Sequence, residues 1–266
     1  CAITVRSAAT EDPTQGTTVT PEIVTPEIPG ESPADVIITS VDYISNPEIQ
    51  EKVIASTDFT EGIVAVDENG NLTANSGTVQ KAVETVIAAD PTISKETVIS
   101  LPIVTSSADQ PGKIHKLGFK VSGDLFGEVT DVRGIKVLKV FPDGKGTLFE
   151  VVTSAAEIRD KAVMLLEEDG TTVTGAIDKS KNYLLTAFVQ DGGTFDLTRD
   201  ANGTVIDPIA IIKVKGTTPE PTPEPTPEPS TGGGSGGGCS TGTAAVLLIP
   251  AAFFILKNRR KKLNTK

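Results

Sequence analysis

The sequence predicts a mainly β fold: a smaller α+β portion, then an antiparallel β-sandwich, disordered Pro-rich linkers and one C-terminal transmembrane helix. Three observations lead to this prediction. Residues 111–216 contain short β-branched runs that recur about every ten residues between Gly- and Asp-rich turns, which is typical of a sandwich. Residues 36–110 mix strand and helix patterns. The chain then ends in an apolar run followed by a basic cluster.

Residues 1–35 are expected to form a linker. Thr, Pro and Glu dominate residues 7–35, and such a stretch buries too little apolar surface to offset the entropy that is lost on ordering. We therefore expect an extended spacer ahead of the folded part.

The beginning of the sequence leaves two interpretations open. Residue 1 is Cys1 and the only methionine is Met164. Cys1 is therefore either the acylated residue of a mature lipoprotein or the edge of a fragment of a longer chain. Residues 3–6 resemble residues 212–215, and both precede Thr-, Pro- and Glu-rich sequence. This echo favours the fragment, with residues 1–6 as the end of an upstream domain of the same kind.

The α+β portion, residues 36–110, has a clear order of elements. Alternation over residues 36–43 predicts a strand. Asn46 as an N-cap, with a proline next to it, predicts a short helix that ends near Ser56. Residues 62–73 are expected to form a small hairpin, and Ser76 is expected to cap a second helix. The apolar face of the second helix consists of Val79, Ala82, Val83, Val86 and Ile87.

The sandwich portion is expected to hold a series of short strands. They are predicted at residues 116–122, 135–141, 148–152, 162–166, 171–176, 183–189 and 205–215. Ser154 and Glu157 fit a capping box, which predicts one helical turn between two of these strands.

The most specific segment of this portion is its end, residues 191–208. The residues that carry the resemblance below are Asp191, Gly192, Gly193, Asp196, Ala201, Asn202, Gly203, Asp207 and Pro208. In this register the segment resembles the closing motif of the choice-of-anchor U domain, an extracellular module found upstream of several bacterial surface anchors. Phe195 stands where Gly is expected and Thr198 where Asp is expected. The resemblance implies a module carried to the cell surface, with no assigned chemistry.

The same segment contains the candidate metal ligands. Side-chain oxygens are supplied by Asp191, Asp196, Asp200, Asn202 and Asp207, and nearby glycines allow the backbone to fold around a centre. Calcium takes about 6–8 oxygen ligands in loose geometry, so it is the expected cation. The alternative is that the Asp and Asn side chains form Asx-turns between two strands, with Gly at positive φ. The sequence leaves both alternatives open.

Residues 239–266 predict a membrane anchor. The uninterrupted apolar run 244–256 covers only about 20 Å at ~1.5 Å per residue, and residues 239–256 reach roughly 27 Å of a ~30 Å hydrocarbon core. The cationic residues 257–262 are expected to stay in the cytoplasm. Everything before Cys239 is then expected outside the cytoplasm, exposed at the surface of the cell envelope.

The C-terminal segment also has the order of a sorting signal. A Gly-rich spacer, Gly238, Cys239, a short apolar helix and a basic end follow one another. This order resembles the bacterial Synergist-CTERM signals and, more loosely, MYXO-CTERM and GlyGly-CTERM. The resemblance implies that an envelope sorting protease cuts at or near Gly238 and Cys239, and that Cys239 is the natural site for a lipid. The alternative is a plain single-pass anchor in which Cys239 has no role.

A stalk is expected between the folded part and the anchor, over residues 217–238. Its Thr-Pro-Glu-Pro repeats favour an extended conformation of about 3.1 Å per residue, and the glycines that follow form a flexible joint that a protease can enter.

The composition agrees with an extracytoplasmic location. Lys and Arg number 24 against 35 Asp and Glu, which gives a formal net charge of −11. An acidic surface repels nucleic acid, so no nucleic-acid partner is expected. Both cysteines, Cys1 and Cys239, lie outside the foldable segments, so the domain must be held by a hydrophobic core and not by a disulfide.

The residues offer no evident catalytic or cofactor site. The only histidine, His115, is expected on the exposed face of a strand and not as a base. Neither a Ser-His or Cys-His nucleophile nor a zinc cluster is supported. Gly-x-Ser-x-Gly occurs only at residues 233–237, inside the spacer. With no Trp and two Tyr, platforms for stacking on sugars are scarce, so we expect no enzymatic activity.

Two classes of function remain. The first is an envelope-anchored structural or adhesive surface protein with an unknown extracellular partner. The second is the C-terminal anchoring part of a larger surface hydrolase or sugar-binding protein, whose active domain would lie upstream of Cys1. A second sandwich upstream would favour the first class, and a catalytic domain would favour the second.

Overall fold

The computed structural model describes residues 17–25, 28, 35–37, 40–56 and 64–215. The predictions for Cys1, the stalk, Gly238, Cys239 and the C-terminal anchor fall outside these residues. Within them, no helix is long and apolar enough to cross a membrane.

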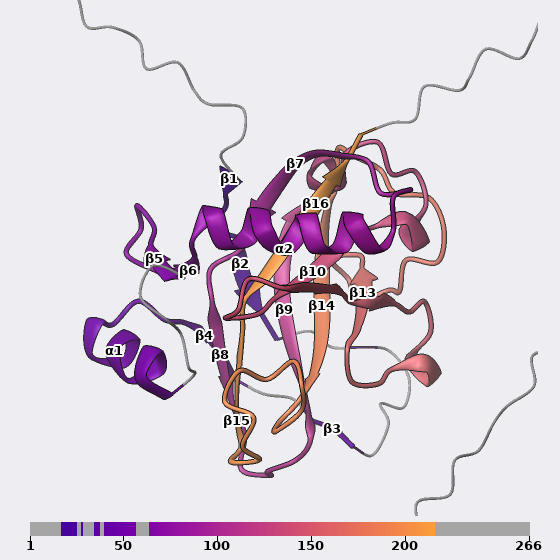
Figure 1. Ribbon diagram of the computed structural model, residues 1–266. Coiled ribbons are helices and arrows are strands. Elements are labelled where there is room, and N and C mark those ends of the chain that lie inside the picture. The colour runs from indigo at the N-terminus through magenta and orange to yellow at the C-terminus, as the bar shows by residue number, and fades with distance from the viewer. Residues whose placement is uncertain (1–16, 26–27, 29–34, 38–39, 57–63, 216–266) are drawn as a thin grey trace, which may run out of the picture. The chain divides into compact units, whose positions relative to one another are not determined.

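The fold is mainly β, as the sequence predicts, and its sheets are antiparallel or mixed (Figure 1). The first sheet has the strand order β1-β7-β16-β10-β11. Its strands are β1 (Thr17–Thr18), β7 (Lys95–Ser100), β16 (Ile209–Val214), β10 (Val137–Val140) and β11 (Gly146–Leu148). The pair β1–β7 is parallel and the other pairs are antiparallel.

The second sheet has the order β12-β13-β14-β9-β2, with β3 also paired to β9. Its strands are β12 (Glu150–Val151), β13 (Ala162–Leu166), β14 (Asn182–Gln190), β9 (Ile114–Ser122), β2 (Glu22–Val24) and β3 (Val36–Ile37). The long central pair β9–β14 is antiparallel, whereas β12–β13 and β3–β9 are parallel. The sheets are therefore not purely antiparallel.

Two smaller sheets complete the fold. One has the order β15-β8-β4, formed by β15 (Thr204–Asp207), β8 (Val104–Ser107) and β4 (Ser40–Tyr43). The other is the hairpin of β5 (Val64–Val66) and β6 (Leu72–Ala74), which the sequence predicts.

The largest hydrophobic cluster joins one face of the first sheet to one face of the second. Its members include Val137, Ile209 and Ile211 from the first sheet and Leu117, Phe119 and Leu185 from the second. Because side chains alternate along a strand, the residues between them in sequence point to the opposite faces. Both sheets are thus buried on two sides over much of their area, which explains why the long strands contain few exposed residues.

Helix α2 (Ser76–Ala89) covers the outer face of the first sheet (Figure 1). The predicted apolar face is confirmed, since its residues pack in one cluster with Leu138 and Ala210. The N-cap is Asn75, one residue before the predicted cap, because its side chain accepts a 2.8 Å hydrogen bond from the Gly77 N–H. Helix α1 (Pro47–Ser56) also forms as predicted.

Residues 17–24, which we expected in an extended spacer, instead extend two sheets. β1 pairs with β7, and β2 pairs with β9 through Ile23 opposite Phe119. The physical reason is that an extended backbone is already the conformation of a strand. Unpaired edges of β7 and β9 offer it hydrogen bonds, and Ile23 adds its side chain to the large cluster.

Four other strand predictions need correction. The strand predicted over residues 148–152 is divided between the two large sheets, because β11 ends at Leu148 and β12 covers Glu150–Val151. Residues 171–176 form only isolated bridges at Thr172 and Ala176. The strand predicted over residues 36–43 is divided between two sheets, as β3 and β4. The strand predicted over residues 205–215 is divided at Pro208, which lacks the N–H that a continuous ladder requires.

Strands from both sides of residue 110 share sheets. β7 pairs with β16, and β8 pairs with β15, so the end of the α+β portion is hydrogen-bonded to the end of the sandwich portion. This arrangement brings the segment 191–208 against β8, β9 and β10, where the candidate site lies.

Candidate functional site

Asp191 directly follows β14, and its buried side chain holds the connection between β14 and β15. It is 2 % exposed, and its carboxylate accepts hydrogen bonds from the backbone N–H groups of Gly112 (2.7 Å), Asn202 (3.3 Å) and Gly203 (2.8 Å). These donors come from two separate loops. Asp191 therefore ties the loop before β9 to the loop before β15.

Asp196 has the same role one turn later. Its Oδ1 accepts from the N–H groups of Thr198 (3.1 Å) and Ile206 (3.2 Å), and its Oδ2 accepts from the Gly192 N–H (3.0 Å) and the Thr198 hydroxyl (2.6 Å). Thr198 occupies the position where the motif is expected to have Asp. Its hydroxyl donates to Asp196, whereas a second carboxylate at this position would repel the Asp196 carboxylate.

The other predicted ligands lie apart from these contacts. Asp200 and Asn202 are exposed, and Asn202 Oδ1 accepts the Thr204 N–H at 2.9 Å. Asp207 is buried against a lysine. In the part of the chain that the structure describes, no group of three or more His, Cys, Asp or Glu residues is arranged to hold a metal ion. Calcium binding stays a prediction of the sequence.

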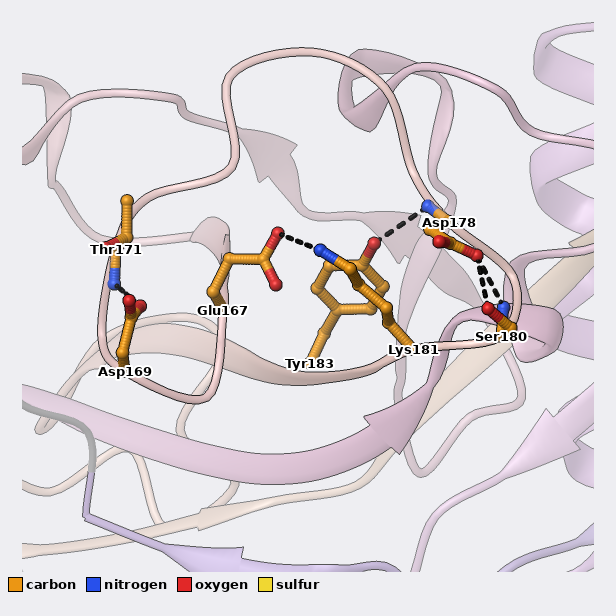
Figure 2. Close-up of polar contacts among 7 residues, drawn as sticks. All are labelled: Glu167, Asp169, Thr171, Asp178, Ser180, Lys181 and Tyr183. Atoms are coloured by element: carbon orange, nitrogen blue, oxygen red, sulfur yellow. Dashed lines mark hydrogen bonds and ion pairs between the residues drawn. The ribbon is translucent and has the colours of Figure 1, made fainter.

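The contacts of Asp196 and Asn202 support the Asx-turn alternative. Each side chain accepts the N–H two residues ahead, which is the defining bond of that turn. Asp169 and Asp178 do the same elsewhere, toward Thr171 and Ser180 (Figure 2). The fold therefore uses aspartate to close its turns at several places.

Positive φ at glycine, which the same alternative requires, is also observed. Gly192 has φ 74° and Gly203 has φ 83°. At Gly203 a Cβ atom would stand 2.4 Å from the Ala108 carbonyl oxygen, so no other residue fits without a shift of the backbone. The Gly203 carbonyl accepts the Ala108 N–H at 2.8 Å, directly after β8, while the Gly203 N–H donates to the Asp191 carboxylate.

Phe195, the second departure from the expected motif, is a buried member of the large cluster. Its ring lies edge-on to Phe149 with centroids 4.9 Å apart, and edge-on to Phe141 with centroids 5.9 Å apart. Edge-to-face pairs of this kind are favourable beyond the area they bury. Phe195 thereby fixes the segment 191–208 to the end of β10, through Phe141, and to the connection between β11 and β12, through Phe149.

Sequence reasoning missed a buried ion pair at the end of the segment. Nζ of Lys139, on β10, lies in direct contact with Oδ1 of Asp207, and both side chains are 0 % exposed. Lys139 shares the inner face of the first sheet with Val137, and its backbone partner is Ile209, two residues after Asp207. A lysine at an inward position of an apolar strand is the signal that could have revealed the pair.

Burial opposes both charges of this pair. Loss of water lowers the pKa of Lys139, although the carboxylates of Asp207 and Asp196 act to raise it. Burial likewise raises the pKa of Asp207 to about 7, against the effect of the Lys139 charge. The two groups are thus displaced toward their neutral forms.

His115 is not on an exposed face, which corrects the prediction. It is fully buried on β9, with Nδ1 2.7 Å from the Ser106 hydroxyl, because it lies two residues before Leu117 and shares the face of β9 that packs in the large cluster. Burial lowers the pKa of His115, although Asp191 and Asp196 oppose the shift. Ser106 is also fully buried, so the pair has a Ser-His contact but no surface at which a substrate could meet it.

A sugar-binding site would be expected to offer an exposed aromatic ring for stacking, and Tyr183 and one surface groove bear on that expectation. Tyr183 is buried, and its hydroxyl accepts the Asp178 N–H at 2.8 Å (Figure 2), so its ring offers no stacking face. A surface groove of about 540 Å³ lies beside β2 and β9. Its lining consists of Glu22, Val24, Thr25, Lys120, Glu168, Asp169, Gly170 and Leu184, with no aromatic ring among them.

Comparisons of this chain with protein-family models, with curated proteins and with solved structures give no match.

Proposed function

We propose that this chain is an envelope-anchored extracytoplasmic surface protein with a structural or adhesive role. The observation that carries the proposal is the order of its C-terminal segments. A Pro-rich stalk and a Gly-rich joint lead to Gly238 and Cys239, then to the apolar run 244–256 and the basic residues 257–262. This order suits a helix that enters the membrane from outside and ends in the cytoplasm.

In this proposal an envelope sorting protease acts at or near Gly238 and Cys239, and the product stays attached to the envelope. The Gly-rich joint supports it, because a flexible stretch is open to a protease. The two packed sheets are proposed to be a β-sandwich of the choice-of-anchor U type. Their common core supports that assignment, as does the hydrogen-bonded turn at Asp191 and Asp196.

The described part of the chain suits display outside the cytoplasm. Both cysteines lie outside the described residues, so its packing rests on apolar clusters and hydrogen-bonded turns, with no contribution from a disulfide. The acidic net charge of −11 is expected to limit binding to nucleic acid and to anionic surfaces. The extracellular partner is of unknown chemistry.

Fractionation of cells that express the full chain tests the proposal. We expect the parent in the membrane fraction, released only by detergent, and a chain without residues 239–266 in the soluble extracytoplasmic fraction. Cys239→Ser should stay in the membrane and retain its C-terminal peptide, which the parent should lose, while the control Ser240→Ala should match the parent. An unchanged distribution after deletion of residues 239–266 would contradict the anchor.

A further inference from the structure

The ion pair of Lys139 and Asp207 is fully buried and lies close to aromatic rings. Both side chains lie between the two large sheets, at the base of the segment 191–208. The Phe141 ring is near the ammonium, with its centroid 5.9 Å from Nζ, and Phe195 packs on Phe141. The pair is therefore packed close to aromatic rings and, within the described part of the chain, its members make a single direct polar contact, with each other.

An ion pair leaves much of this site unsatisfied. Among the described residues, Asp207 Oδ2 has no hydrogen-bond partner, and Asp207 is the one acceptor that contacts Lys139 Nζ. An ammonium and a carboxylate each need several partners, whereas an amide has only one N–H and one C=O. Buried charges without those partners are costly, because the attraction between them does not replace the lost water.

We propose that Lys139 and Asp207 condense in the folded chain to form an intramolecular isopeptide bond, which joins Nζ of Lys139 to Cγ of Asp207. The bond would link β10 to the end of β15 and close a loop between residues that are 68 positions apart in the sequence. This inference concerns the folded part alone and does not depend on where the protein is located.

The chemistry needs no external reagent. A proton passes from the Lys139 ammonium to Oδ1 of Asp207 along their contact, which leaves a neutral amine beside a neutral carboxylic acid. The nitrogen lone pair attacks Cγ to form the N–C bond. A second proton moves from nitrogen to Oδ1, the Cγ–Oδ1 bond breaks, and one water molecule leaves. Oδ2 becomes the amide oxygen, and nitrogen keeps one hydrogen.

Position and environment favour this condensation. The reacting groups are held in contact by two strands, and effective concentrations of oriented groups reach on the order of 10⁵–10⁸ M. Burial also lowers the pKa of Lys139 and raises that of Asp207 to about 7, toward the neutral forms that react. The charge of Asp196 acts on both groups and would stabilise a positive nitrogen during the reaction.

The intact mass of the purified and denatured full chain tests the proposal. We expect a mass lower by one water molecule than the sequence of the observed termini requires. After digestion, the peptide with Lys139 should be joined to the peptide with Asp207, and trypsin should not cut after Lys139. Lys139→Met and Asp207→Ala should each show the full mass, whether or not they fold, because the measurement is made on denatured protein.

Two controls separate the proposed bond from other losses of water. Asp-Gly sequences, such as Asp143-Gly144 and Asp191-Gly192, can lose water as cyclic imides, but these reopen in mild alkali and an amide does not. Lys179→Met removes an exposed ion pair with Glu128 and should keep the lower mass. A full mass in the parent, with Lys139 and Asp207 in separate peptides, would overturn the proposal. A loss that alkali reverses, or that persists in Lys139→Met, would overturn it too.

Discussion

The Gly203 N–H donates a 2.8 Å hydrogen bond to Oδ2 of Asp191, so a buried carboxylate closes the turn between β14 and β15. The same carboxylate accepts the Gly112 N–H at 2.7 Å, which ties the turn to the start of β9. Negative side chains in this segment thus work as acceptors for backbone donors, a role that does not need a cation.

Asp191→Ala and Asp196→Ala should each destabilise the protein strongly. Each change removes the acceptor of at least three buried or half-buried donors, which should lower the free energy of unfolding by roughly 3 kcal/mol. Asp200→Ala, at an exposed carboxylate, should change it by less than about 0.5 kcal/mol. Urea denaturation of the three variants measures the difference, and equal effects at Asp191 and Asp200 would contradict this role.

Calcium provides a second measurement on the same variants. If the segment binds calcium, millimolar calcium should raise the melting temperature of the parent and raise it less in Asp196→Ala and Asp200→Ala. If the turn is held only by its hydrogen bonds, the parent should melt at the same temperature with and without calcium. Because the acceptors of Asp196 are already used by N–H and O–H donors, we expect the second result.

Gly203→Ala and Gly70→Ala should separate backbone strain from close contact. Both glycines have positive φ, 83° and 81°, so both variants lose about 1 kcal/mol from the left-handed conformation. Only at Gly203 would the new Cβ meet a backbone atom, the Ala108 carbonyl oxygen at 2.4 Å, whereas nothing lies within 4 Å at Gly70. We expect Gly203→Ala to be the more destabilising in thermal denaturation, and equal losses would contradict the close contact.

His115 should make stability depend on pH near neutrality. Its pKa in the folded state lies below the ordinary 6.5, so below pH 6.5 the unfolded chain binds a proton that the folded chain does not. The free energy of unfolding should therefore fall as pH decreases through this window, by at most about 1.4 kcal/mol per pH unit. Above pH 6.5 both states are neutral and this contribution is constant.

The variant His115→Gln isolates that effect. Asp207, if it is not linked, contributes with the opposite sign, because its raised pKa lets the folded chain hold a proton up to about pH 7. This contribution is common to parent and variant and cancels in their difference. Chemical denaturation between pH 5 and 7 should show a smaller decrease toward low pH in His115→Gln, whereas identical profiles would exclude His115 as the source.

The folded module should extend further toward the N-terminus than the sequence predicts. A chain of residues 17–215 should melt cooperatively and without regard to reductant, since its core contains no cysteine. A chain of residues 36–215 should melt at a lower temperature, because it lacks β1, β2 and the contact of Ile23 with the large cluster. Equal melting temperatures in calorimetry would show that residues 17–24 add no stability.

Local patterns predicted the elements that depend on local contacts. The face of α2, the hairpin β5–β6 and the long strands β9, β13 and β14 follow from periodicity and turn residues. The pairing of β1 and β2 did not, because an extended Thr- and Pro-rich segment has the same pattern as a spacer until an edge is available to it. Pro208, which divides one predicted strand into β15 and β16, was visible in the sequence, but which sheet each half joins depends on distant partners.

In the candidate site too, contacts between residues distant in sequence could not be predicted from local patterns. The spacing of Asp191, Asp196 and Gly203 indicated a structured turn, but not which backbone groups its carboxylates would accept. His115 lies in phase with Leu117 and Phe119, so alternation along β9 indicated a shared apolar face, which the prediction of an exposed histidine overlooked. The contact of Lys139 with Asp207 joins residues 68 positions apart, and only the pairing of β10 with β16 brings them together.

Surface labelling of intact native cells tests the central claim most directly. A membrane-impermeant reagent that reacts with amines should modify Lys179 and Lys181, whose side chains are 42 % and 54 % exposed, before the cells are opened. A cytoplasmic protein in the same cells should stay unmodified, and digestion followed by mass spectrometry identifies the modified lysines. Modification of Lys179 and Lys181 in intact cells is the result that we predict. Modification only after the membranes are broken would contradict display of this protein at the cell surface.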